Sequence, residues 1–216
     1  MKIVDASYNI VLPYPDWDTA RNTLLQMIEN AGRTCYKSEN KISPESASRF
    51  VRSIVKNGHE AMLEHAGLTV RFTVDRGVSH ELVRHRLASF AQESTRYCNY
   101  SKDKFGRELT FIRPFFLKDE QFTLWEKAMK EAEIAYFSLL ESGCTPQEAR
   151  TVLPNSLKTE VVMTANMREW RHFLKLRAVG TTGAPHPQMA EVATPLLCEL
   201  QKRLPEIFDD LGGEAE

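Results

Sequence analysis

The 216-residue sequence predicts a single α/β domain, and three observations support this prediction. Segments that alternate apolar and polar residues are interleaved with segments whose apolar residues recur at helical spacing. The chain is 42% hydrophobic and 26% charged, which is typical of one soluble domain large enough to bury a core. The sequence contains no internal repeat, linker or low-complexity tract. We therefore expect one domain over residues 1–216.

The order of these segments defines the expected elements. Strands are expected at residues 2–12, 67–77, 109–112 and 157–166. Helices are expected at about residues 16–32, 43–58, 78–87, 119–142, 167–177 and 187–204. Asp16 or Asp18 can cap the first helix, and Gly32 is expected to end it. Residues 97–107 and 178–187 are expected to form loops.

The charge balance argues against nucleic acid as a partner, and the lack of a long apolar segment argues against a membrane span. The chain has 28 Lys+Arg against 29 Asp+Glu, so it lacks the basic excess that drives nonspecific nucleic-acid binding. No segment approaches the apolar length of a membrane span, and the N-terminal apolar run is too short for a signal peptide. The scattered cysteines, which include no C-x-x-C pair, are Cys35, Cys98, Cys144 and Cys198. We expect a cytoplasmic protein in which any anion site is local.

Arg86 lies on the apolar stripe of the helix expected at residues 78–87. On a helical wheel, Val78 and Leu82 fall on one broad arc that also contains Arg86. Burying a guanidinium without a partner costs on the order of several kcal/mol, so an inward Arg86 requires an anion or a carboxylate. The alternatives are a bound anion, an ion pair within the chain, or a helix that ends before Arg86.

A second arginine ends the apolar stripe of a later helix. Trp170 and Phe173, at positions i and i+3, are followed at i+7 by Arg177, which is therefore expected to point inward. Arginine stays charged when desolvated, and its planar fork of donors suits phosphate or paired carbonyl oxygens. Two inward arginines, with Arg150 on a short helix as a third candidate, predict a binding site for an anion.

Ser94 follows the RHR tripeptide and carries a hydroxyl group that suits anion binding. A serine nucleophile needs a base within reach, and the sequence has neither a G-x-S-x-G elbow nor a recognisable His-Asp pairing. As a donor between Gln92, Glu93 and Arg96, the Ser94 hydroxyl suits phosphate binding better. An ordinary polar turn remains the alternative.

The segment GHEAMLEH, residues 58–65, contains two histidines and two glutamates. It is not the H-E-x-x-H motif, because Leu63 stands in place of the second histidine, and no cysteine pair supplements it. We therefore expect no metal. A histidine and a carboxylate that orient a ring system, or a plain capping turn, are the favoured alternatives.

The sequence lacks the common nucleotide-binding motifs. It contains no G-x-x-x-x-G-K-[ST] motif and no G-x-G-x-x-G motif after a strand. A P-loop nucleotide triphosphatase and a Rossmann dehydrogenase are therefore not supported. The GTTG sequence at residues 180–183 fits a backbone anion cradle and a flexible loop equally well.

The tripeptide Arg84-His85-Arg86, followed after seven residues by Ser94, resembles the signature of flavin-dependent thymidylate synthases. GHEAMLEH precedes it at the expected distance, and segments 150–154 and 166–177 follow in family order, so the resemblance covers most of the chain. It implies a mixed sheet flanked by helices. It also implies conversion of dUMP to dTMP with methylenetetrahydrofolate as carbon donor, NADPH as reductant and FAD as redox carrier, in a homotetramer with shared active sites.

The resemblance also implies site residues by position. The implied FAD contacts are His59, Ala61, Arg84, His85, Arg86, Gln92, Asn166, Arg168 and His172. The implied dUMP contacts are Glu81, Arg84, Gln92, Glu93, Ser94, Thr95, Arg96, Arg150 and Arg177. Arg177 is the implied catalytic residue, because it matches the arginine thought to stabilise the ionised uracil ring. The pyrophosphate of FAD and the phosphate of dUMP would explain why arginines gather in one site.

The chain departs from the family pattern at several of these positions. Glu81 stands where glutamine is common, Ala91-Gln92 replaces Asn-Glu, Ala61 replaces a small hydroxyl residue, and His172 replaces a frequent asparagine. A carboxylate at position 81 would repel a nucleotide phosphate unless a neighbouring cation neutralised it. Uracil specificity is therefore less secure than flavin binding.

Two alternative functions follow. The first is a family relative that transfers a different one-carbon unit or acts on another deoxynucleotide, which Glu81 and the long loop at residues 178–187 motivate. The second is a nonenzymatic nucleic-acid-binding module that uses the basic segment with Tyr97 and Tyr100, which the balanced charge disfavours.

Overall fold

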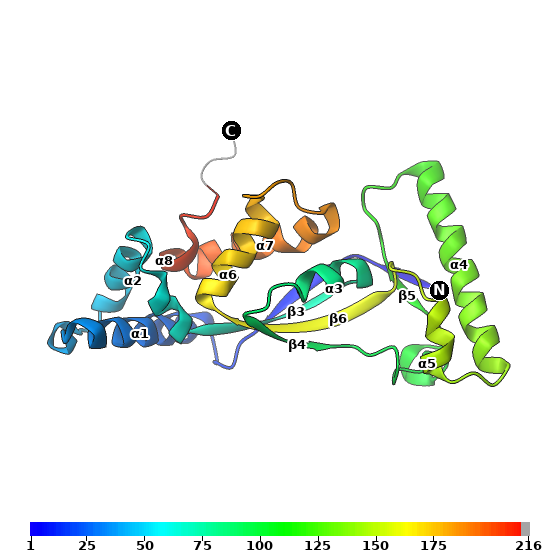
Figure 1. The fold of residues 1–216 in the computed structure, drawn as a ribbon, viewed down its shortest axis with the longest axis horizontal. Coiled ribbons are helices and arrows are strands. Elements are labelled where there is room, and N and C mark those ends of the chain that lie inside the picture. The colour runs from blue at the N-terminus through cyan, green and yellow to red at the C-terminus, as the bar shows by residue number, and fades with distance from the viewer. Residues whose placement is uncertain (213–216) are drawn as a thin grey trace. The chain divides into compact units, whose positions relative to one another are not determined.

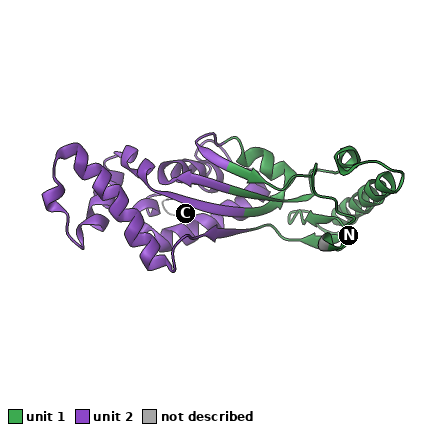
Figure 2. Cartoon of the chain, turned by 90° about the horizontal axis from the view of Figure 1, so that it is seen from below, with its two compact units in different colours: residues 1–7, 72–84, 90–162 green, residues 8–71, 85–89, 163–216 purple. Residues whose placement is uncertain are grey.

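The computed structural model describes residues 1–212, and the chain divides into two compact units (Figure 2). Unit 1 consists of residues 1–7, 72–84 and 90–162, and unit 2 of residues 8–71, 85–89 and 163–216. The strands that contribute residues to both units include β3 (Gly67–Asp75), β4 (Ala88–Gln92) and β6 (Lys158–Asn166). The expectation of a single domain stays a prediction.

The strands form two sheets, which confirms the predicted α/β fold class. One sheet has the strand order β2-β3-β6-β4, in which β2 spans Ser7–Val11. The other pairs β1 (Lys2–Val4) in parallel with β5 (Thr110–Ile112). The apolar residues of β3 that the alternation predicted to face the core are buried, namely Leu68, Val70, Phe72 and Val74.

The helices of unit 2 are α1 (Trp17–Tyr36), α2 (Ser46–Lys56), α6 (Met167–Leu174), α7 (Pro187–Arg203) and α8 (Pro205–Phe208), with 3-10 turns η1 (Glu39–Lys41) and η2 (Glu60–His65). Helices α1 and α2 lie side by side (Figure 1). The Asp16 side chain caps α1, because it accepts a hydrogen bond from the Thr19 amide at 2.7 Å. Helix α6 buries its apolar stripe completely at Trp170, Phe173 and Leu174.

The helices of unit 1 are α3 (Arg76–Leu82), the long α4 (Asp119–Glu141) and α5 (Pro146–Ala149), with 3-10 turns η3 (Asp103–Phe105) and η4 (Arg150–Val152). Helix α4 packs one narrow face inward at Met129 and Tyr136. A core forms between this face and residues from the loops and strands of the unit, namely Tyr100, Leu109, Phe111, Ala149 and Leu157.

The prediction that Gly32 ends the first helix is wrong. Helix α1 continues to Tyr36, and Lys37 ends it in the left-handed region at φ 46°. Gly32 lies in the helix because Phe50 packs directly against it, and a Cβ atom at this position would lie 2.4 Å from the Phe50 ring. Glycine here permits a close approach between α1 and α2 rather than a turn.

The helix predicted at residues 78–87 is shorter and begins earlier. Asp75 caps it by accepting a hydrogen bond from the Val78 amide at 2.7 Å, and the helix ends at Leu82. The prediction that Arg86 continues the apolar stripe and points inward is therefore wrong. Arg86 is exposed, and the buried residue of the RHR tripeptide is His85, with 5% of its surface exposed.

Two strand predictions also need correction. The expected opening strand at residues 2–12 is interrupted at Asp5 and Ala6, and its halves β1 and β2 belong to different sheets. The strand β4 was not expected, because its sequence ASFAQ is short and lies within the RHR-x7-S segment. β4 lies at the edge of the sheet, next to β6. Its formation depends on this pairing more than on a hydrophobic pattern in its own sequence.

The helix expected at residues 167–177 changes character after Leu174. Residues Lys175–Val179 form a π-helix, and Gly180 ends it with φ 78°. A π-turn widens the helix locally and is frequent at functional sites. It carries Arg177, which is half-buried, as its place at the end of the apolar stripe predicts.

An arginine that the sequence did not single out is the most buried one of α6. Arg171 is 1% exposed. Its guanidinium donates to both carboxylate oxygens of Asp210 at 2.6 Å, to Glu60 at 3.0 Å, and to the Ile207 carbonyl. Burial alone would lower the pKa of Arg171, but Asp210 and Glu60 raise it above its ordinary value. This arginine joins α6 to η2 and to the segment after α8.

Candidate active site

His85 is the buried centre of a polar cluster in unit 2. Its Nε2 atom accepts a hydrogen bond from Nε of Arg177 at 3.3 Å, and its Nδ1 atom lies 3.6 Å from Oε1 of Glu169. The ring of Phe173 meets the imidazole edge-on with the centroids 4.9 Å apart, and the His172 ring lies 6.0 Å away. The fold therefore joins the RHR tripeptide to residues more than 80 positions later in the chain.

The surroundings of His85 keep its imidazole neutral. Burial, followed by the electrostatic effects of Arg177 and His172, lowers the pKa of His85 to about 4. Because Nε2 accepts the hydrogen bond from Arg177, the single ring proton belongs on Nδ1, which faces Glu169. Burial also raises the pKa of the Glu169 carboxyl. A neutral imidazole holds the Arg177 guanidinium without repelling it.

A hollow of about 440 Å³ in unit 2 is lined by two of the predicted FAD contacts. Arg86 and Asn166 both line it, with Glu64 beside them. The Asn166 side chain caps α6 by accepting a hydrogen bond from the Glu169 amide at 2.9 Å. Arg168, in the first turn of α6, is half-exposed and pairs with Glu64 at 2.6 Å. Cationic and amide donors therefore surround one end of α6.

His59 and Ala61 line a different hollow of unit 2, which has a volume of about 280 Å³ and is mostly apolar. Its other lining residues are Gly32, Cys35, Tyr36, Phe50, Ile54 and Met62. The turn η2 connects the two hollows, because His59 and Ala61 lie at its start and Glu64 at its end. Four of the predicted FAD contacts of unit 2 thus line two different hollows, Arg86 and Asn166 the first, and His59 and Ala61 the second, mostly apolar one.

In unit 1, the residues after β4 are held by hydrogen bonds within the unit. Gln92 donates through Nε2 to Ser79 at 2.9 Å and to Thr159 at 3.2 Å. The hydroxyl of Ser94 accepts a hydrogen bond from the Arg96 amide at 3.3 Å, and Thr95 is buried. The Gln92 amide group therefore has hydrogen-bond partners within the fold, whereas Ser94 is a partly exposed residue.

Two of the predicted dUMP contacts of unit 1, Arg96 and Arg150, lie beside α5. Nε of Arg96 donates to Gln147 of α5 at 3.2 Å, and the exposed Arg150 follows α5 directly. Arg84 is exposed beyond the end of α3, and its amide donates to the Glu81 carbonyl at 3.2 Å. Ser94, Arg96 and the Arg150 segment thus lie in one part of unit 1, with donors that suit a phosphate.

Glu169 is a member of the site that was not predicted from the sequence. The sequence does contain a local feature that involves Glu169. Asn166 caps α6, and Glu169 is the third residue after it, where the capping-box pattern places a glutamate. That pattern explains a helix start and does not reveal the 3.6 Å approach to His85. The partner of a buried residue is set by packing and not by sequence distance.

Within residues 1–212, no group of three or more His, Cys, Asp or Glu side chains is arranged to hold a metal ion. In the same part of the chain, no helix has the length and apolar character required to cross a membrane.

The class of fold is shared with a solved nucleotide methylase. The fold resembles that of PolB, a UMP/dUMP methylase from Streptomyces cacaoi solved with bound 5-Br dUMP, with a TM-score of 0.77 and 22% sequence identity. The likeness covers 97% of this chain and 96% of that chain. At this identity the comparison establishes the fold.

Sequence comparisons identify the family. A protein from Corynebacterium aurimucosum is 36% identical, over 90% of this chain and 84% of its own length. A protein from Geobacter sulfurreducens is 34% identical, over 84% and 79% respectively. Both are named flavin-dependent thymidylate synthase. The family model described as thymidylate synthase complementing protein matches residues 20–206. The chain belongs to this family of enzymes, as the RHR-x7-S motif predicted.

Proposed function

We propose that the protein is a flavin-dependent thymidylate synthase that methylates dUMP reductively to dTMP, with FAD as redox carrier. Methylenetetrahydrofolate is the proposed carbon donor and NADPH the proposed reductant. The observation that carries the proposal is the hydrogen bond between His85, in the RHR tripeptide, and Arg177, the implied catalytic residue. Two parts of the family pattern that lie 92 residues apart meet in one cluster, as a shared role in catalysis requires.

The residues of unit 2 fit a flavin dinucleotide. Arg86 and Asn166 line a hollow of about 440 Å³, which is a typical volume for a ligand site, and Arg168 pairs with Glu64 of the same lining. The charges of the two arginines suit the FAD pyrophosphate, and His172 adds a further exposed donor on α6. The apolar hollow at His59 and Ala61 suits a ring system. When bound, FAD supplies the hydride chemistry that side chains lack.

The residues of unit 1 fit the phosphate of dUMP. Arg96 and Arg150 supply cations, and the Ser94 hydroxyl supplies a neutral donor. The proposed nucleotide site also includes Glu81, Arg84 and Thr95 from the family pattern. Glu81 requires a neighbouring cation to avoid repelling the phosphate, and Arg84 is close to it in the chain.

Arg177 is the proposed electrostatic catalyst. Its Nε–H group donates a hydrogen bond to neutral His85, and a guanidinium keeps its charge when it is desolvated. A guanidinium presents several N–H donors, which suit the stabilisation of negative charge as it develops on a uracil ring. His85 orients this group, and Glu169 in turn faces the proton that fixes the tautomer of His85.

Assembly and location are part of the proposal. A homotetramer with shared active sites would bring polar residues of several chains together around one nucleotide. We propose that this tetramer works in the cytoplasm, as the four scattered free cysteines favour.

The second candidate is a family member that acts on a different pyrimidine nucleotide or transfers another one-carbon unit. Half-buried Glu81, at a position implied to contact the nucleotide, motivates it. The mass of the product formed from dUMP, UMP and dCMP separates the two candidates. A nonenzymatic nucleic-acid-binding module is not favoured for a member of this enzyme family.

The test of the proposed function is tritium release. The substrate is dUMP that carries tritium on the carbon to be methylated, with FAD, NADPH and the folate donor present. We expect release by the wild type and a loss of about 10²-fold or more for Arg177→Ala, by analogy with removing an oxyanion donor. Arg107→Ala, a matched exposed arginine paired only locally with Asp103, is the control and should retain activity. Release that is absent from the wild type, or unchanged in Arg177→Ala, contradicts the proposal.

A further inference from the structure

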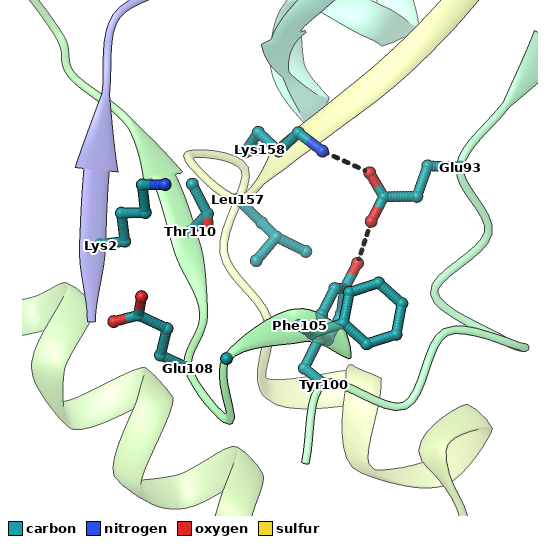
Figure 3. A pocket seen from close by; sticks show the side chains of 9 residues that line it. Lys2, Glu93, Tyr100, Phe105, Glu108, Thr110, Leu157 and Lys158 are labelled. Atoms are coloured by element: carbon teal, nitrogen blue, oxygen red, sulfur yellow. Dashed lines mark hydrogen bonds and ion pairs between the residues drawn. The ribbon is translucent and has the colours of Figure 1, made fainter. Parts of the chain in front are cut away.

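A pocket of unit 1 with a volume of about 350 Å³ lies on one side of the segment that follows β4 (Figure 3). Its lining residues are Lys2, Glu93, Tyr100, Phe105, Gly106, Glu108, Thr110, Leu157 and Lys158. Figure 3 shows the Glu93 carboxylate at the edge of this pocket, between the ends of the Lys158 and Tyr100 side chains. The family pattern implies that Glu93 contacts the nucleotide, so the direction of its carboxylate needs an explanation.

Both carboxylate oxygens of Glu93 already have partners in the protein. Oε1 accepts a hydrogen bond from the Tyr100 hydroxyl at 2.9 Å, and Oε2 accepts one from Nζ of Lys158 at 3.0 Å. The Glu93 side chain is 15% exposed and that of Lys158 is 21% exposed. A partly desolvated, charge-assisted pair of this kind is stronger than an ion pair on the surface.

The partners of Glu93 are themselves fixed. Tyr100 is 6% exposed and packs against Phe105 and Tyr136 in the core of unit 1. Burial and then the Glu93 charge raise the pKa of Tyr100, so its hydroxyl remains a donor. Lys158 opens the strand β6 and also bonds Glu160 at 3.0 Å. Burial alone would lower the pKa of Lys158, but these two carboxylates raise it, so the ammonium stays charged.

The backbone around Glu93 leads directly into the proposed phosphate-binding residues. The Glu93 amide donates to the Glu160 carbonyl at 2.9 Å, which ties the end of β4 to β6. The next carbonyl, that of Ser94, accepts hydrogen bonds from the amides of Tyr97 and Cys98 at 3.2 and 2.9 Å. The Ser94 hydroxyl and the Arg96 guanidinium therefore extend from a tight turn whose first anchored side chain is Glu93.

We propose that Glu93 is a positioning residue, which with Lys158 and Tyr100 forms a clasp that fixes the turn carrying Ser94 and Arg96. The inference rests on the proposed function, because this turn is proposed to bind the dUMP phosphate. Glu93 acts through the turn and not through contact with the nucleotide, because its carboxylate is directed toward Tyr100 and Lys158 and accepts a hydrogen bond from each. The clasp contributes pre-organisation, which lowers the cost of ordering the turn when the nucleotide binds.

The test compares substitutions of the three clasp residues in the full-length enzyme loaded with FAD. Three variants each break part of the clasp: Glu93→Gln, Lys158→Met and Tyr100→Phe. Lys158→Arg keeps the positive charge, so it should retain the clasp and behave like the wild type. Glu160→Gln is the matched control, because it removes the other carboxylate partner of Lys158 and leaves the link to Glu93 intact. Two readouts are used: steady-state kinetics with dUMP, and amide hydrogen exchange of Tyr97 and Cys98.

We expect Glu93→Gln and Lys158→Met to raise KM for dUMP by roughly tenfold, which is the size of one charge-assisted hydrogen bond, with kcat changed less than about threefold. Tyr100→Phe should have a smaller effect in the same direction. The Glu93→Gln, Lys158→Met double variant should be no worse than either single variant, because the two residues act as one unit. FAD content should not change.

Two results would overturn the clasp. In the first, only Glu93→Gln weakens dUMP binding while Lys158→Met does not, which means that Glu93 contacts the nucleotide itself. In the second, hydrogen exchange of the turn is the same in Glu93→Gln and in Glu160→Gln. The exchange readout needs no nucleotide, so faster exchange without any binding of dUMP to the wild type supports the clasp and contradicts the proposed function.

Discussion

The surroundings of His85 in unit 2 and of Lys158 in unit 1 accommodate an ionisable group away from water in opposite ways. His85 is 5% exposed, and burial, followed by the electrostatic effects of Arg177 and His172, lowers its pKa to about 4, so the ring is neutral. Lys158 is surrounded by the carboxylates of Glu93 and Glu160, so it stays charged. The comparison shows that burial alone does not decide whether a group is charged. The charges of the neighbouring groups decide it as well.

Arg171 is the extreme case of the second kind, and its substitution should have the largest effect on stability. Arg171→Leu removes the cation that Asp210 and Glu60 share. The Glu60 side chain is 21% exposed and that of Asp210 is 49% exposed. We expect the free energy of unfolding to fall by about 3–5 kcal/mol, the usual cost of removing one member of a buried ion pair. Urea denaturation followed by circular dichroism measures it. A loss below about 1 kcal/mol would mean that the pairing contributes no more than a surface contact.

The neutral state of His85 predicts a dependence of stability on pH. The folded-state pKa of about 4 lies below the unfolded value of about 6.5, so the unfolded state binds more protons between these values. The contribution of His85 is therefore fully present above pH 6.5 and is lost as the pH falls toward 4, by about 3 kcal/mol in all. Denaturation of the wild type and of His85→Gln over this range isolates the slope. Parallel curves would show that His85 titrates normally in the folded protein.

The charged state of Lys158 predicts a smaller effect. Lys158→Met keeps the apolar stem and removes the ammonium, so Glu93 and Glu160 lose the cation that they share. We expect a loss of about 1–2 kcal/mol, between the values for surface and buried pairs. The thermal unfolding midpoint measures it. Equal stability of Lys158→Met and the wild type would remove the contrast with His85.

The smallest effect is expected at Arg168, which pairs with Glu64 while about half of each side chain is exposed. Arg168→Ala should change stability by less than about 1 kcal/mol. Because Arg168 and Arg171 lie on the same helix and both pair with a glutamate of η2, this substitution is the matched control for Arg171→Leu. A loss as large as that of Arg171→Leu would show that burial is not what distinguishes the two arginines.

Periodicity in the sequence predicted the strands and helices whose pattern is long. The alternation in β3 and the spacing in α6 each extend over most of their element, so tertiary packing had little to override. Short β4 has no such pattern, and pairing with β6 forms it. Gly32 was misinterpreted because a glycine that ends a helix and one that admits Phe50 look alike in one dimension.

The motif predicted which segments form the site more reliably than which side chains face inward. The RHR tripeptide does reach Arg177, but through His85 and not through Arg86, because α3 ends at Leu82. Glu169 and Arg171 could not be assigned from the sequence. Their partners His85, Glu60 and Asp210 come from distant segments, and only the fold brings them within contact distance.

The most direct test of the account is the visible absorption spectrum of the purified protein during titration with dUMP. If the arginines around α6 hold FAD and those near α5 hold the nucleotide, the protein carries a flavin band, or acquires one with added FAD, and dUMP perturbs that band. A folded protein that remains colourless in excess FAD would contradict the account.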